Sequence, residues 1–273
     1  MAIPNCAAHA PPACRFFLRF ICLLTLATGI GLTPATRGDG RSEKTKELTA
    51  RAEEKYLGAQ KRLRAQPDDT KAVWEFAQAC FNRAEFATNN AERATLALQG
   101  ITPCRELLDR GVRHAAVHYY LAMNLGQLAR TKTLGALKIV NEMEREFKMA
   151  RALDEQLEFA GPDRCLGLLY FEAPRIGSIG SRSKARQHLQ MAVAVSPDYP
   201  ENRLNLAETF VKWTDHHLAK RELKALLVLW PKARADYTGP DWEASWLDWD
   251  ARLVRLQENV EEQAKADAAR KRR

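Results

Sequence analysis

Apolar residues recur at helical spacing along the chain from Glu43 onward. In the first such segment they follow each other at steps of three or four residues: Leu48, Ala52, Tyr56, Ala59 and Leu63. This spacing places one apolar stripe on a helix. The same kind of pattern predicts further helices over about 90–110, 114–129 and 134–153, so the chain is expected to be all-α.

Cap and breaker residues divide the predicted helices. The run Asp68–Thr70 offers side chains that cap a helix starting near Lys71. Gly100 and Pro103 predict a kink or break in the helix over 90–110. Near the end of the chain, Thr238–Asp241 opens a last helix, on which three tryptophans fall on one face and predict a capping role: Trp242, Trp246 and Trp249.

One set of spacings indicates a repeat. If Ala207 is the small residue at position 8 of a 34-residue helical hairpin, Phe210, Ala219, Leu223 and Pro231 fall at positions 11, 20, 24 and 32. This pattern resembles the tetratricopeptide repeat, and it implies a tetratricopeptide-repeat-like helical solenoid of about four degenerate repeats with a C-terminal capping helix. Gly126 and Gly167 take the small position in earlier repeats, and the hairpin after Gly167 is lengthened over 173–183.

The first 35 residues differ from the rest. Apart from Arg15 and Arg19 they are uncharged, and an apolar run over 20–32 ends in Thr33, Pro34 and Ala35. This pattern is typical of a secretory signal peptide cleaved after Ala35. We therefore expect a signal over 1–35, a linker over 36–42, the repeat domain over 43–265 and a basic tail over 266–273. The protein is expected to be exported, to the periplasm or otherwise outside the cytoplasm, and to meet a membrane only through the signal before cleavage. An uncleaved membrane anchor is the alternative.

Charge and cysteines narrow the function classes. The formal net charge is +8, but positive and negative residues interleave along the helices, which argues against a nucleic-acid partner. After removal of the signal the chain keeps Cys80, Cys104 and Cys165. Their spacing is not that of a zinc or redox site, and buried thiols are the favoured interpretation, with one disulfide left open.

The sequence predicts neither an enzyme nor a bound cofactor or metal. His114 and His118 are one helical turn apart, but nothing in the sequence supplies a third ligand, so a structural pair is favoured. The glycine-rich run over 177–181 lacks the order of a phosphate-binding loop, and neither a serine nor a cysteine nucleophile motif is present.

Repeat geometry predicts a groove from the inward positions of the first helix of each hairpin. The candidate partner or ligand residues are Tyr120, Met123, Gln127, Arg130, Arg164, Leu168, Phe171, Glu172, Glu208 and Lys212. This lining mixes aromatic, basic and acidic side chains, as a site for a peptide or a small amphipathic solute would. Arg164 is the sharpest candidate because its guanidinium can bind a carboxylate through two parallel hydrogen bonds.

A more specific resemblance covers about residues 74–231. The stretch 119–126, the run Gly161–Tyr170, Ala173–Pro174 and the helix from Lys184 to Pro197 resemble the T component of tripartite ATP-independent periplasmic (TRAP) transporters. The resemblance implies a periplasmic scaffold that binds a protein partner, a solute-binding protein, as an accessory of solute uptake. The alternative function is direct carriage of a small hydrophobic or carboxylated ligand in the repeat groove.

Overall fold

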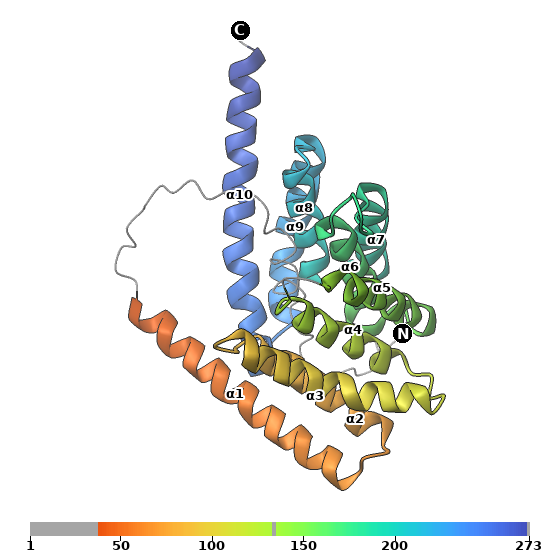
Figure 1. Cartoon of the computed structure of the whole chain (residues 1–273). Coiled ribbons are helices and arrows are strands. Elements are labelled where there is room, and N and C mark those ends of the chain that lie inside the picture. Colours follow the sequence, from red (N-terminus) through yellow and green to blue (C-terminus); the bar gives the residue numbers. More distant parts are fainter. Residues whose placement is uncertain (1–37, 133–134, 272–273) are drawn as a thin grey trace, which may run out of the picture. The chain divides into compact units, whose positions relative to one another are not determined.

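The structure is a computed structural model that describes residues 38–132 and 135–271 (Figure 1). The regular elements of these residues are all helical. They form two compact units, which are described separately below. The amino-terminal unit comprises the described residues up to Leu157 together with 172–181, and the carboxy-terminal unit comprises 158–171 and 182–271. The predicted signal peptide and its cleavage site lie outside the described residues.

The amino-terminal unit contains five helices: α1 (Gly38–Ala65), α2 (Thr70–Ala84), α3 (Asn90–Asp109), α4 (Ala115–Ala129) and α5 (Ala136–Leu153). Helices α2 and α3 pack as one hairpin and α4 and α5 as the next, and α4 also packs on both α2 and α3. Asp69 caps α2, because its carboxylate accepts a hydrogen bond from the Ala72 amide at 2.8 Å, as predicted. Apolar residues from α1, α2 and the start of α3 form a shared core around Tyr56 and Phe76.

Two elements of this unit differ from expectation. Helix α1 begins at Gly38, inside the segment predicted as a linker. Of the kink or break predicted at Gly100 and Pro103, the break is absent, because α3 is continuous through both residues. A proline removes one backbone hydrogen bond, but Ile101 and Cys104 on either side of it are fully buried, so packing maintains the helix across the weak point.

The carboxy-terminal unit contains α6 (Leu157–Glu172), whose first residue precedes the unit, α7 (Arg182–Val195), α8 (Pro200–Lys212), α9 (His216–Asp236), a short 3₁₀ helix η2 (Pro240–Trp242) and α10 (Glu243–Lys271). The connection between α6 and α7 is long and that between α8 and α9 is short, as the repeat spacing predicts. Gly167 lies where α6 and α7 cross, since a Cβ there would be 2.6 Å from Leu189 Cγ. This close contact is the physical reason for a small residue at that repeat position.

Aromatic side chains join α8, α9 and α10. Tyr199 and Tyr237 pack edge-on against Trp249, which is fully buried, and Trp246 lies 4.9 Å from Trp249 between ring centroids. Helix α10 covers α8 and α9, so the capping role predicted for the tryptophans is confirmed.

Two helix ends differ from expectation in this unit. The repeat pattern predicts that Pro231 ends its helix, but α9 continues to Asp236. Trp230 packs edge-on against Trp246 at 5.5 Å, and Leu229 and Ala233 are buried, so the side chains around Pro231 are held in the helical arrangement. Helix α10 extends to Lys271, through most of the segment predicted as a basic tail.

Candidate functional site

The predicted groove residues are divided between the two units, and each group is described within its own unit. In the amino-terminal unit, Tyr120, Met123 and Gln127 of α4 are fully buried, whereas the Arg130 side chain remains 13% exposed. Tyr120 accepts a hydrogen bond from Gln78 at 2.6 Å and stacks on Trp74 at 6.0 Å, both from α2. These α4 side chains therefore contribute to the contact between the first helices of successive hairpins.

The largely buried carboxylate of Glu85 lies beside Gln127 and Arg130. Glu85 accepts hydrogen bonds from Gln127 and from Arg130, the latter at 2.9 Å. Burial raises the pKa of Glu85 above its usual value, although Arg130 opposes the shift. The pKa of Arg93 is lowered by burial and by repulsion from Arg130. Arg130 is therefore already engaged by Glu85 and Gln127, and the Arg130 and Glu85 side chains are each 13% exposed.

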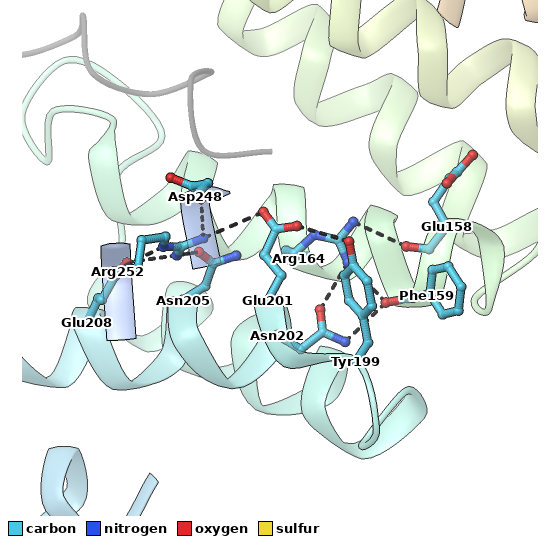
Figure 2. Close-up of polar contacts among 10 residues, drawn as sticks. All are labelled: Glu158, Phe159, Arg164, Tyr199, Glu201, Asn202, Asn205, Glu208, Asp248 and Arg252. Carbon is cyan, nitrogen blue, oxygen red and sulfur yellow. Dashed lines mark hydrogen bonds and ion pairs between the residues drawn. The ribbon is translucent and has the colours of Figure 1, made fainter. Parts of the chain in front are cut away.

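In the carboxy-terminal unit, Arg164 is fully buried and holds a turn at the start of α6. Three successive residues, Glu158, Phe159 and Ala160, adopt left-handed backbone conformations with φ between 51° and 62°. The Arg164 guanidinium donates to the carbonyl oxygens of Phe159 at 3.0 Å and Glu158 at 3.1 Å. Figure 2 shows the guanidinium directed at this turn.

The same guanidinium connects α6 to α8. It donates to Asn202 Oδ1 at 3.0 Å and lies over the Tyr199 ring, with Cζ 5.0 Å from the ring centroid. Asn202 in turn donates to the carbonyl oxygens of Phe159 and Ala192. Arg164, Asn202 and the Phe159 carbonyl are thus all bonded to one another, and this network joins the turn to α8.

A second buried arginine, Arg252 of α10, was not identified from the sequence. It donates to both carboxylate oxygens of Glu208, at 3.1 and 2.8 Å, and also to Asn205. Burial alone would lower the pKa of Arg252, but Glu208 and the neighbouring carboxylates outweigh burial and raise it. A sequence signal existed, because Arg252 falls on the same face as Trp249, Leu253 and Leu256, and a charge on an apolar face requires a buried partner.

Glu201 lies between the two arginines in Figure 2 and is fully buried. It accepts a hydrogen bond from the Tyr199 hydroxyl at 3.1 Å and has an oxygen 3.8 Å from Arg252 Nη1. Burial, followed by the charge of Glu201, raises the pKa of Tyr199 well above its usual value, so this hydroxyl stays protonated as a donor. The network therefore extends from the α6 turn through α8 to the capping helix.

The remaining predicted residues have different surroundings. Leu168 is 8% exposed, and Phe171 is partly buried with its ring 5.8 Å from Trp213. Glu172 is partly buried in the amino-terminal unit, Glu208 holds Arg252, and Lys212 is exposed at the end of α8. The structure thus places Arg164 and Glu208 in one polar network and leaves Lys212 outside it.

Two histidines pair with carboxylates of a neighbouring helix, and the three described cysteines are buried. His118 Nδ1 lies 2.6 Å from Glu146 Oε2 between α4 and α5, and His188 Nδ1 lies 2.6 Å from Asp163 Oδ1 between α7 and α6. Cys80, Cys104 and Cys165 are buried free thiols. Within residues 38–132 and 135–271, no group of three histidine, cysteine or carboxylate side chains could hold a metal ion. In the same residues, none of the helices combines the length and the apolar character that crossing a membrane would need.

Comparison with solved structures identifies the fold. The chain is similar to a thermophilic TPR protein from Thermus thermophilus, with a TM-score of 0.57 and 19% identity, over 80% of this chain and 96% of that one. At this identity the likeness establishes a TPR-like helical solenoid. No protein-family model and no curated protein matches the chain.

Proposed function

We propose that this protein is an exported helical-repeat scaffold that binds a partner protein. The observation that carries the proposal is the fold, a TPR-like series of antiparallel helical hairpins. Solenoids of this kind present extended surfaces that bind other chains. Their characteristic repeat residues pack the helices against one another. The apolar run over 20–32 supports export.

The finer proposal is a role as an accessory of periplasmic solute uptake, with a solute-binding protein as partner. It is supported by the resemblance of the run Gly161–Tyr170, and of the long connection after it, to the TRAP T component. Because Arg164 and Glu208 bond to other side chains of the carboxy-terminal unit, the partner would meet side chains that remain accessible, such as Lys212.

Cross-linking and mass spectrometry of the gently purified, exported protein test this function. We expect a co-purifying exported protein in near-stoichiometric amount, and a solute-binding protein would support the transport role. A small molecule retained without any protein partner would instead support the ligand carrier. Sequencing the mature amino terminus tests export separately: cleavage after Ala35 is expected, and Met1 retained on exported protein would indicate an anchor.

A further inference from the structure

One exposed cluster of the carboxy-terminal unit combines arginine with tryptophan. We call it the arginine–tryptophan edge and define it by Arg182 and Arg186 of α7, Trp213 at the end of α8, and Asp215 before α9. Arg182 Nη2 and Arg186 Nη2 donate to the same oxygen, Asp215 Oδ2, at 2.9 and 2.8 Å. Two positive charges therefore share one negative charge, and the edge carries a surplus positive charge.

The two arginines remain accessible. Their side chains are 47% and 37% exposed, and each guanidinium has five N–H donors, more than one aspartate oxygen can use. Lys212, at the end of α8 directly before Trp213, is also exposed and adds to the positive charge. An arginine can hold a carboxylate through two parallel hydrogen bonds, which gives geometric specificity as well as attraction.

Both guanidinium groups pack against aromatic rings. Arg182 Cζ lies 4.7 Å from the Trp213 ring centroid, and Arg186 Cζ lies 5.6 Å from it. Trp213 is itself held by edge contacts with Phe171 and Phe210. Stacking restricts the arginines before any ligand arrives, which lowers the entropy cost of binding. Tryptophan and arginine are also the residue types enriched among those that dominate binding energy at protein interfaces.

Helix stability does not explain these residues. Asp215 occupies the N-cap position of α9, but its side chain makes no capping hydrogen bond and bonds to the two arginines instead. Helix α7 carries basic residues and no acidic ones in its first turn, the opposite of what the helix dipole favours. Ion pairs this exposed contribute little to folding. The arrangement is instead suited to an external anionic group.

We propose that the arginine–tryptophan edge binds an acidic segment of the partner protein. Arg182 and Arg186 take its aspartate or glutamate carboxylates, and its chain packs beside Trp213. This inference rests on the proposed scaffold function and adds to it the binding surface and the chemistry of the partner.

Binding of a labelled hexaglutamate peptide to the full chain tests the edge directly, by fluorescence anisotropy. The double variant Arg182→Ala/Arg186→Ala should weaken binding by about tenfold or more, because it removes charge-assisted hydrogen bonds. The matched control Lys224→Ala/Arg255→Ala removes the same charge from exposed positions of α9 and α10 and should bind like the wild type. Circular dichroism and the melting midpoint should be the same for both double variants.

Two further variants separate specific recognition from general attraction. Replacing both arginines with lysine keeps the charge and should restore only part of the affinity, since an ammonium lacks the planar fork. Asp215→Asn should tighten binding severalfold, because it removes the competing carboxylate while asparagine remains a good N-cap residue.

Equal weakening by the two double variants, or binding of hexaglutamine as tight as that of hexaglutamate, would overturn the proposal. So would tighter, arginine-dependent binding to phosphatidylglycerol vesicles than to the peptide, which would assign the edge to a membrane surface.

Partner capture distinguishes this inference from the scaffold function. Capture of one exported protein by the wild type and the control, but not by the Arg182→Ala/Arg186→Ala variant, supports the edge. Equal capture by all three overturns the edge and leaves the scaffold function standing. Failure of the wild type to capture any protein contradicts the scaffold function, and the peptide measurement still decides whether the edge binds acidic chains.

Discussion

Arg164 is buried because the left-handed turn at the start of α6 uses its donors. The turn directs the carbonyl oxygens of Glu158 and Phe159 toward a single guanidinium, which also reaches Asn202 on α8. A buried acceptor that loses its donor is left without a hydrogen bond, because water does not reach it, and the folded state is destabilised. At the scale of single residues, Arg164 therefore has the contacts expected of a stabilising residue.

Arg164→Ala should lower the free energy of unfolding by about 3 kcal/mol, because Glu158 O and Asn202 Oδ1 lose their donor and Phe159 O keeps only its bond from Asn202. Arg164→Lys should lose less, since an ammonium reaches some of them. Urea denaturation followed by circular dichroism measures the effect, with exposed Arg255→Ala as the control. Unchanged stability combined with weaker partner capture would assign Arg164 to the binding groove that repeat geometry predicts.

Gly100 is a second residue whose role depends on its neighbours. A Cβ at this position would lie 2.7 Å from the Asn124 side chain, which is fixed by hydrogen bonds to the carbonyl oxygens of Ala77 and Tyr120. Gly100→Ala should therefore destabilise by roughly 1 to 3 kcal/mol through overpacking. Gly58 of α1 is the comparison, because a Cβ there would lie 3.7 Å from the nearest neighbouring side-chain atom, at ordinary contact distance. Gly58→Ala should therefore stabilise the protein by up to about 1 kcal/mol. If both substitutions stabilise the protein, the close contact of α3 with α4 is incorrect.

At the scale of helices, α8 and α3 end in the same way with different residues. After α8, the amides of Thr214 and Asp215 donate to Val211 and Phe210; after α3, those of Gly111 and Val112 donate to Leu108 and Leu107. This is the Schellman motif, which requires a left-handed residue just past the helix. Gly111 has φ of 83° and adopts this conformation easily, whereas Thr214, with φ of 59°, is β-branched.

The two helix ends give a reciprocal prediction. Thr214→Gly should raise the free energy of unfolding by about 1 kcal/mol, because it relieves a left-handed β-branched residue. Gly111→Thr should lower it by a similar or larger amount for the converse reason. Melting midpoints of both variants and the wild type measure the pair, and a loss of stability in both would show that the Thr214 side chain contributes more than its backbone conformation costs.

The elements differ in how well the sequence predicts them. Apolar spacing and caps identified the hairpins, the small residue at Gly167 and the tryptophans of η2 and α10, because these depend on local pattern. The uninterrupted passage of α3 through Pro103 and of α9 through Pro231 depends on tertiary packing, which outweighs local preference. The α6 turn could not be predicted, since Glu158, Phe159 and Ala160 are not residues that usually adopt left-handed conformations.

At the scale of the whole molecule, each unit contains buried ionic groups that tie its helices together, so stability should depend on pH. In the amino-terminal unit, Glu146 is 5% exposed and lies 2.6 Å from His118 and 2.8 Å from Arg145. Burial alone would raise its pKa, but the hydrogen bonds from His118 and Arg145 outweigh burial and lower it. Glu85 of the same unit has a raised pKa, so its contribution to the pH dependence of stability has the opposite sign. The stability of the wild type at each pH therefore combines both contributions, and a variant is needed to isolate that of Glu146.

Glu146→Gln should isolate that contribution. A lowered pKa means that the carboxylate stabilises the fold above its unfolded pKa of about 4.3, and that this stabilisation is lost as the pH falls through the lower, folded pKa. The variant should therefore be less stable than the wild type by about 2 kcal/mol at pH 7, the range for hydrogen bonds to a charged group, and the difference should shrink as the wild-type carboxylate becomes protonated. Urea denaturation from pH 7 down to pH 3 measures the difference, with the exposed Glu258→Gln as the control. A difference that stays constant over this range would mean that Glu146 contributes through packing, and that the link it forms between α4 and α5 does not depend on its charge.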